Sequence, residues 1–459
     1  MKKAKHILLI CMIILLCSSC AGNGTPTPAP APDQPQQNDQ PRQDDTPDTP
    51  TADNLLLDEN ATPNTDVLPR GFQKDNAWVT AAKGSTSVLY YASQDVPFSY
   101  TDKTGATVND SVWLRRLKSE YDITLHLVRK NNATSLAAQS LALLSGAQID
   151  ILSFTPDQLA YAGGLAADIT LLEEADIEQA DYLNKTALTY RRKGAAYLMP
   201  VGVARALWYT PQNTADDPYA LSQKKEWTLS AFTKYVKNSI TMENDTVKRT
   251  GLEIKETAQL LAALGTPLIT MDQNGALQAG DAQNNIKTLS ALLSTKGACS
   301  SGSEKEAPSL LDGTLAMRYG STPFVTTAEK YPAVNWAPLP TADGDKNAGR
   351  VIASAPVLAL PKKSTQAKAS LAAALLYTAR FADANHDRMR FTYGLSFDKW
   401  KAYYTASDEQ LEIVCLPSAE TRNRLFELLT EKTDDFSESW KEIHTQTEAF
   451  VTEKNYERY

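Results

Sequence analysis

Residues 137–154 read AAQSLALLSGAQIDILSF and join a predicted helix to a predicted strand through a Ser-Gly turn. Leucines recur on one side of the helix predicted over residues 134–145, and Gly146 is its C-terminal stop. The run over residues 149–154 is mostly apolar, as in strands that are buried in a sheet. The stretch therefore predicts a helix followed directly by a buried strand.

The chain before this stretch alternates in the same way. Residues 88–91 predict a first buried strand, residues 108–121 carry apolar side chains at helical spacing, and residues 123–128 predict a second strand. With residues 134–154 the order becomes β-α-β-α-β, which implies a parallel sheet with right-handed crossovers. The expected fold class is therefore α/β.

The second half of the chain is richer in helices. Residues 204–209 predict an apolar strand, and residues 351–360 (VIASAPVLAL) predict one long buried strand. The length of 459 residues exceeds the roughly 250–300 at which a single core stops growing, so two lobes are expected. Further helices are predicted to start at Trp227-Thr228, to cover residues 256–264, 286–293 and 367–381, and to continue from residue 420 onward.

The N-terminus has the pattern of an export signal. Three lysines in the first five residues precede the apolar run ILLICMIILL over residues 7–16. That run is shorter than the roughly 20 apolar residues that cross a bilayer, and it is typical of a secretory signal. Ser18 and Ser19 stand before Cys20 as in the lipobox of a bacterial lipoprotein. We expect residues 1–19 to be a lipoprotein signal peptide and Cys20 to be lipidated, with ordinary secretion as the alternative.

The segment after Cys20 is too polar to form a core. Residues 21–50 contain eight prolines, five aspartates and no aromatic residue, a composition typical of disorder. We expect residues 20–84 to form a lipid-anchored disordered tether. Such a tether would hold the folded body at the outer face of the bacterial cell membrane.

Charge and metal-binding residue types exclude other classes. The formal net charge of −8 gives no basic face for nucleic acid. Four histidines and five cysteines are too dispersed for a zinc cluster, so we expect no metal and no cofactor. His126, His386 and His444 are expected at surface or edge positions. Cys299 and Cys415 are compatible either with one disulfide or with two buried thiols.

Several short motifs occur in order along the chain. They are residues 137–154, GLAADI at 164–169, KGAAYLMP at 193–200, Trp227-Thr228, LDGTLAMRYG at 311–320, NWAPLP at 335–340, and the strand before Lys362-Lys363-Ser364. Each motif alone is weak, but the series covers roughly residues 85–400. Together the motifs resemble the extracellular solute-binding proteins of ATP-driven (ABC) importers, of the maltose-binding type.

The resemblance implies a two-lobed periplasmic-binding-protein-like fold of type II, with parallel-sheet lobes joined by hinge crossings. The ligand would lie in the interlobe cleft and be buried by hinge closure, without any bond being made or broken. The chain would then be a monomer and not an enzyme. The boundaries expected are 85–203 and 204–350 for the first parts of lobes 1 and 2, 351–395 for a return to lobe 1, and 396–459 for C-terminal helices mainly of lobe 2.

Candidate ligand-binding residues follow the predicted strands, where polar groups converge in an open α/β sheet. Arg205 is included because it interrupts an apolar strand at the predicted hinge. Phe154 as a core residue and Asp157 as a helix cap remain alternatives. The full set is Tyr91, Ser93, Gln94, Phe154, Asp157, Gln158, Arg205, Tyr319, Ser321 and Thr322.

The N-terminal signal and the resemblance together favour a lipid-anchored substrate-binding protein that captures a small polar solute and delivers it to the permease subunits of an ABC importer. The expected solute is a mono- or oligosaccharide. One alternative is a ligand-sensing lipoprotein that signals to a membrane receptor. Another is an exported glycan-active enzyme, which would need two carboxyl groups roughly 5–10 Å apart. No G-x-S-x-G, H-E-x-x-H or phosphate-binding loop supports the enzyme.

Overall fold

The computed structural model divides the chain into two units, Met1–Thr49 and Pro50–Tyr459, and every residue described below belongs to the second. The lipidation candidate Cys20 and the signal peptide lie outside the described residues. The structure describes residues 58–90, 98–128, 136–154, 189–192, 195–198, 204–211, 217–271, 276–301, 307–324, 330–347, 349–353, 357–361, 364–409, 411–412, 414–431 and 435–456.

The first lobe contains the predicted β-α-β-α-β succession. β1 and β4 pair in parallel. An isolated parallel bridge between Leu89 and Ile151 places the third predicted strand on the other edge of β1. The Asn109 side chain caps α4 by accepting a hydrogen bond from the Val112 N–H at 3.0 Å. The elements are β1 (Thr86–Tyr90), α4 (Asp110–Tyr121), β4 (Thr124–Val128), α5 (Leu136–Leu144), and the hairpin of β2 (Ser99–Thr101) with β3 (Thr107–Asn109).

A four-stranded sheet follows in the order β5-β17-β7-β6, and all its pairings are antiparallel. Leu358 in β17 pairs with Ser153 of β5 on one side and with Leu198 of β7 on the other. A strand from late in the sequence therefore completes an early sheet. The bounds are β5 (Leu152–Phe154), β6 (Thr189–Arg192), β7 (Ala195–Leu198) and β17 (Val357–Ala359).

The second lobe is built on an eight-stranded sheet in the order β13-β10-β14-β8-β16-β18, with β15 also on β8 and β9 on β10. β10 is parallel to β13 and β14, whereas β8 is antiparallel to β14, β15 and β16. The bounds are β8 (Ala204–Tyr209), β9 (Thr241–Glu243), β10 (Thr246–Glu253), β13 (Cys299–Ser300), β14 (Leu315–Gly320), β15 (Asn335–Ala337), β16 (Val351–Ala353) and β18 (Leu411–Glu412).

The long strand predicted over residues 351–360 is wrong. The segment forms two short strands in two sheets, because β16 pairs with β8 while β17 pairs with β5 and β7. Pro356 lies between them, and proline has no N–H to donate to a continuous ladder. The apolar run is therefore a crossing between the two sheets.

Helices cover the second sheet. α7 buries Phe232, Tyr235 and Val236, as its spacing predicted. Thr228 stands at the N-cap of α7, but the cap is made by Asp343, whose Oδ1 accepts the Ser230 N–H at 2.9 Å. The remaining elements of this lobe are α6 (Pro218–Gln223), α7 (Leu229–Ser239), α8 (Thr257–Ala263), the hairpin of β11 (Ile269–Met271) with β12 (Leu277–Ala279), α9 (Gln283–Leu293), α12 (Ala419–Thr430) and α13 (Phe436–Tyr456).

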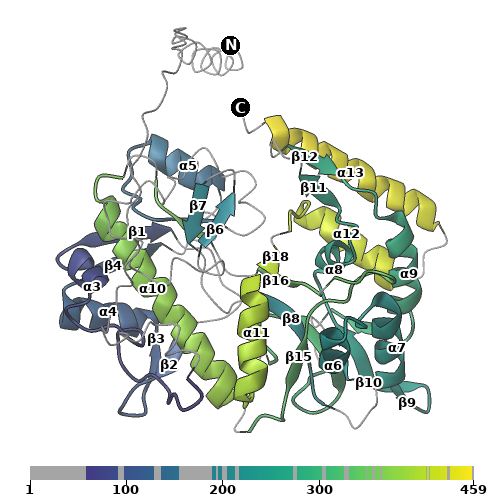
Figure 1. Ribbon diagram of the computed structural model, residues 1–459. Helices are drawn as coiled ribbons and strands as arrows, with labels where there is room; N and C mark the ends of the chain where they lie inside the picture. Colours follow the sequence, from purple (N-terminus) through teal and green to yellow (C-terminus); the bar gives the residue numbers. More distant parts are fainter. Residues whose placement is uncertain are drawn as a thin grey trace, which may run out of the picture. The chain divides into compact units, whose positions relative to one another are not determined.

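The helix α10 (Ala367–Asp387) is buried along almost its whole length. It packs on the short helix α3 (Ala77–Ala82), as Figure 1 shows. Leu371 to Phe381 belong largely to the core of the first lobe, whereas Ala382 belongs to a core formed with β8, β15 and α11 (Phe397–Glu409). A π-helical turn, η5 (Arg388–Thr392), directly follows α10.

The tether predicted over residues 20–84 extends too far along the chain. Residues 58–84 are folded on the first lobe, with Val67 and Leu68 buried and Trp78 and Val79 contributed by α3. The apolar pairs at 67–68 and 78–79 lie within a stretch whose average composition is polar. The prediction of disorder is therefore wrong for residues 58–84, because those pairs bury enough apolar surface to pack.

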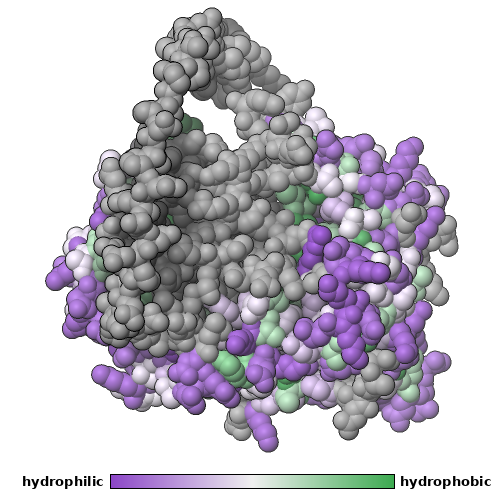
Figure 2. Space-filling view, viewed as in Figure 1, coloured by the Kyte–Doolittle hydropathy of each residue, from purple (hydrophilic) through white to green (hydrophobic). Residues whose placement is uncertain are grey.

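Hydrophilic residues dominate the coloured part of the face in Figure 2, and apolar ones form smaller patches. Large exposed apolar side chains among the described residues include Leu141 and Leu144 of α5. Every helix in the described part of the chain is too short or too polar to cross a membrane.

Candidate functional site

The carboxyl edge of the eight-stranded sheet is where polar side chains gather. Because β10, β13 and β14 are parallel, their C-terminal ends lie along one edge. β8 is antiparallel to β14, so its first residue, Ala204, lies at the same edge and pairs with Ala353, the last residue of β16. Both connections to the four-stranded sheet leave from here. In open α/β sheets this edge is the usual place for a ligand.

Three charged side chains meet at this edge. The Arg205 Nη1 atom lies 3.9 Å from Oε1 of Glu256, and the Arg422 Nε atom lies 3.9 Å from the other oxygen, Oε2. Arg205 comes from β8, Glu256 precedes α8, and Arg422 lies in the first turn of α12. The side chains are 19%, 28% and 27% exposed, so solvent reaches all three. The sequence prediction included Arg205 and missed Glu256 and Arg422.

Tyr319, Ser321 and Thr322 lie beside this edge but are buried. The Tyr319 ring belongs to the core of the second lobe, and its hydroxyl donates a hydrogen bond to Oε1 of Gln259 at 2.6 Å. The Thr322 hydroxyl donates to the Phe324 carbonyl at 3.0 Å. The structure therefore gives Tyr319 and Thr322 internal partners and buries Ser321, and the binding role of all three stays a prediction.

A second ion pair lies on the opposite face of the sheet. The Arg318 Nη1 atom is 2.7 Å from Oε1 of Glu253, and these residues are neighbours on the parallel strands β14 and β10. Beside them the Trp208 Nε1–H donates to the Gly320 carbonyl at 2.8 Å. Like Arg205, Arg318 interrupts an apolar strand. That signal was available in the sequence and identifies both arginines.

An aromatic cluster follows β14 on this opposite face. The ring centroids of Phe324 and Tyr331 lie 4.8 Å apart, and Tyr393 is 5.4 Å and 5.2 Å from them. Arg388 lies next to the two tyrosines, and burial lowers the pKa of its guanidinium. Its Nη2 atom donates to the Ser99 hydroxyl of β2 at 2.8 Å. The cluster therefore joins the second lobe to a hairpin of the first.

The other predicted site residues cannot be placed as side chains. Phe154 ends β5 and its backbone pairs with Val357 in β17, while its ring lies outside the described residues. The remaining positions outside the described residues are Tyr91, Ser93, Gln94, Asp157 and Gln158.

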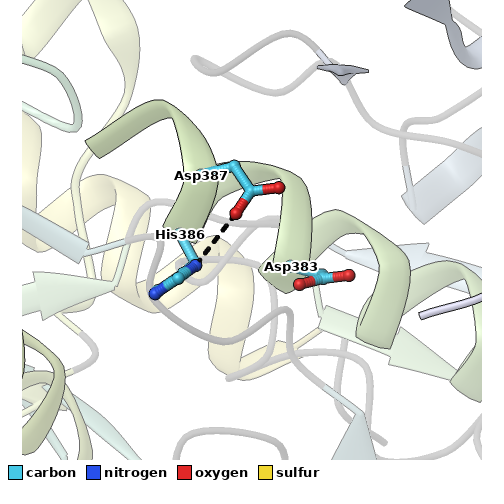
Figure 3. A group of neighbouring side chains, drawn as sticks. All are labelled: Asp383, His386 and Asp387. Carbon is cyan, nitrogen blue, oxygen red and sulfur yellow. Dashed lines mark hydrogen bonds and ion pairs between the residues drawn. The ribbon is translucent and has the colours of Figure 1, made fainter. Parts of the chain in front are cut away.

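The spacing that metals use occurs at the end of α10. Asp383, His386 and Asp387 have ligand atoms within 4.8 Å of one another. Figure 3 shows that the His386 ring turns its Nδ1 toward Asp387, at 3.1 Å. The Arg70 guanidinium lies among them, with Nη1 paired to Asp383 and Nη2 2.5 Å from Oδ1 of Asp387. Arg70 thus supplies the positive charge that a cation would bring.

The expectation that His386 lies at the surface or an edge is wrong. Its side chain is buried, and its ring meets the Trp400 ring edge-on at a centroid distance of 4.3 Å. Burial lowers the pKa of His386, while the hydrogen bond to Asp387 opposes that shift. The histidine is therefore neutral in the folded protein near pH 7.

The two remaining cysteines are not joined. Cys415 is buried and Cys299 is half-buried, and no disulfide joins them. The disulfide that the sequence left open is therefore not formed, and of the two thiols only Cys415 is buried as expected.

The fold was compared with known proteins. No protein-family model matches the sequence, and no curated protein matches it either. Among solved structures, the chain is similar to an ABC substrate-binding protein from Listeria monocytogenes in complex with cycloalternan. The TM-score is 0.52 at 14% identity, over 74% of this chain and 94% of that one.

Two further structures agree in fold. The galacto-N-biose-/lacto-N-biose I-binding protein of the ABC transporter from Bifidobacterium longum, in complex with lacto-N-biose, matches with a TM-score of 0.51 at 13% identity, over 80% of this chain and 97% of that one. The maltose/maltodextrin-binding domain from Bdellovibrio bacteriovorus, bound to maltotriose, matches with a TM-score of 0.50 at 13% identity, over 74% and 94%. The chain therefore has the two-lobed α/β fold of type II binding proteins.

Proposed function

We propose that this protein is a lipid-anchored extracellular substrate-binding protein that captures a carbohydrate and delivers it to an ABC importer. The observation that carries the proposal is the fold. It matches nearly the whole length of three proteins that are described as bound to a sugar, as part of an ABC transporter system, or as both.

The carboxyl edge of the second sheet supports a binding role. Arg205, Glu256 and Arg422 present planar polar groups, which suit the hydroxyls of a sugar. The peptide segments that connect the two sheets leave from the same edge, so a ligand held there would be next to both lobes. In this proposal the first lobe contributes Tyr91, Ser93, Gln94, Phe154, Asp157 and Gln158 from across the cleft.

The anchor is the second part of the proposal. Lipidation of Cys20 would attach the chain to the outer face of the membrane, and the polar segment before residue 58 would serve as the tether. A tether of that composition allows the body to reach the permease subunits of an importer from a fixed point on the membrane. The protein would act as a monomer with no cofactor.

Binding is tested by titrating the purified protein with neutral and acidic mono- and oligosaccharides in a calorimeter. At 100 times its dissociation constant, a ligand that binds only the folded state adds about 2.7 kcal/mol to the free energy of unfolding. The same samples are analysed for products. Unchanged sugar recovered from the complex supports a binding protein, and hydrolysed sugar would support an enzyme instead.

A further inference from the structure

Arg422 occupies an unusual position for an arginine. It lies in the first turn of α12, where the helix dipole favours negative side chains and disfavours positive ones. Its ion-pair partner among the described residues is Glu256, at 3.9 Å, which is beyond hydrogen-bond distance. Its guanidinium makes no hydrogen bond to the described residues. The contacts of Arg422 with the described residues therefore do not compensate for the unfavourable interaction with the helix dipole, which points to a role in binding a ligand.

Glu256 brings a second arginine to the same place. Its other carboxylate oxygen faces Arg205 at 3.9 Å, so one carboxylate lies between two guanidinium groups. Counting these three side chains, the charge at the edge is +1. All three are part-exposed, and they come from β8, the segment before α8, and α12. The group therefore forms only when the second lobe is folded.

The position of the group matches that of a ligand site. Arg205 lies on the strand that pairs with β16, next to the crossings between the sheets. Glu256 follows the C-terminal end of β10. The fork of N–H donors on an arginine fits a planar carboxylate, which accepts two parallel hydrogen bonds from it.

We propose that the saccharide bound at this edge is anionic, and that Arg422, with Arg205 beside it, recognises its negative group. The inference rests on the proposed function and adds the class of substrate. The negative group is a uronate carboxylate or a sulfate ester, since both present the acceptor oxygens that a guanidinium binds. Glu256 lies between the two guanidinium groups and offsets the repulsion between them.

The test uses matched oligosaccharides that differ only at C6, which carries a hydroxymethyl group, a carboxylate or a sulfate ester. α-1,4-Linked digalactose, digalacturonate and the 6-sulfated disaccharide form one such set, and equivalent sets of glucose and mannose disaccharides extend it. The purified full chain is titrated with each. An anionic member should bind at least tenfold more tightly than its neutral partner, with an affinity that falls as salt rises.

Variants connect the preference to the arginine. Arg422→Gln should weaken binding of the anionic sugar about ten- to a hundredfold and should weaken binding of its neutral partner less. Arg424→Gln, two residues along the same helix and paired with Glu420 and Glu442, is the matched control and should change neither. The conservative variant Arg422→Lys should restore part of the affinity, because it keeps the charge without the fork.

The outcomes separate this inference from the proposed function. Binding of neutral sugars that equals or exceeds binding of their anionic partners overturns the inference and leaves a sugar-binding protein. So does anionic binding that survives Arg422→Gln. Absence of binding to every sugar of the panel overturns both.

Discussion

Replacement of Arg70 by methionine should destabilise the protein strongly, because Arg70 pairs with two buried carboxylates, and Asp383 then keeps only its longer contact to Arg380, at 3.5 Å. The Arg70 side chain is 11% exposed, Asp383 is 2% exposed and Asp387 is 11% exposed. Removal of one partner from a buried pair costs about 3–5 kcal/mol. Arg70 also donates from Nη2 to the Thr62 carbonyl, so the segment before it loses an attachment as well.

Urea denaturation measures this loss as a lower midpoint and a smaller free energy of unfolding. Arg424→Met is the matched control, because Arg424 also contacts two carboxylates but is 37% exposed. Exposed pairs contribute about 0–1 kcal/mol, so the control should stay close to the natural protein.

A double variant tests whether the lost charge is the cause. Asp383→Asn removes one of the two carboxylates that lose Arg70, so the double variant should be less destabilised than the sum of the two single variants. A loss of under 1 kcal/mol for Arg70→Met, equal to that of Arg424→Met, would refute the reasoning. It would mean that the network at the end of α10 is exposed to water in solution.

Three other predictions follow from the structure. Tyr319→Phe removes the hydrogen bond to Gln259 and should lower the free energy of unfolding by about 1 kcal/mol in urea denaturation; unchanged stability would contradict a structural role for that hydrogen bond, and a loss of sugar affinity would support the predicted binding role of Tyr319. The pKa of His386, which faces Asp387, Asp383 and Arg70, is lowered from 6.5, so the unfolded chain takes up a proton first as the pH falls and the free energy of unfolding should decline below pH 6.5. His386→Gln should flatten that decline. The same slope of urea midpoint against pH in the variant, between pH 5.5 and 7, would contradict the assignment of the decline to His386. Cys20→Ala should move the protein from the membrane fraction to the soluble fraction without changing its melting temperature, and retention on membranes would argue against lipidation.

Local patterns in the sequence determined most of the helices and strands. The strand predicted at residues 204–209 is β8, with the same bounds. The apolar spacing within α7 and the α/β alternation before residue 154 also appear in the structure, because periodicity reports which face of an element is buried. Composition likewise predicted a polar segment after Cys20, but it extended that segment over residues 58–84, where two apolar pairs are enough to pack.

Tertiary structure alone decided which faces meet. Arg205, Glu256 and Arg422 come from three distant parts of the sequence, and only the antiparallel pairing of β8 and the packing of α12 on α8 bring them together. The same holds for Arg70 and Asp383, and for the apolar run at 351–360, which divides between two sheets. Hydrophobic burial is non-directional, so a sequence pattern shows that a side is buried without naming its partner. Partner and register are set by the global packing of the chain, and the charged groups at the sheet edge take their positions from it.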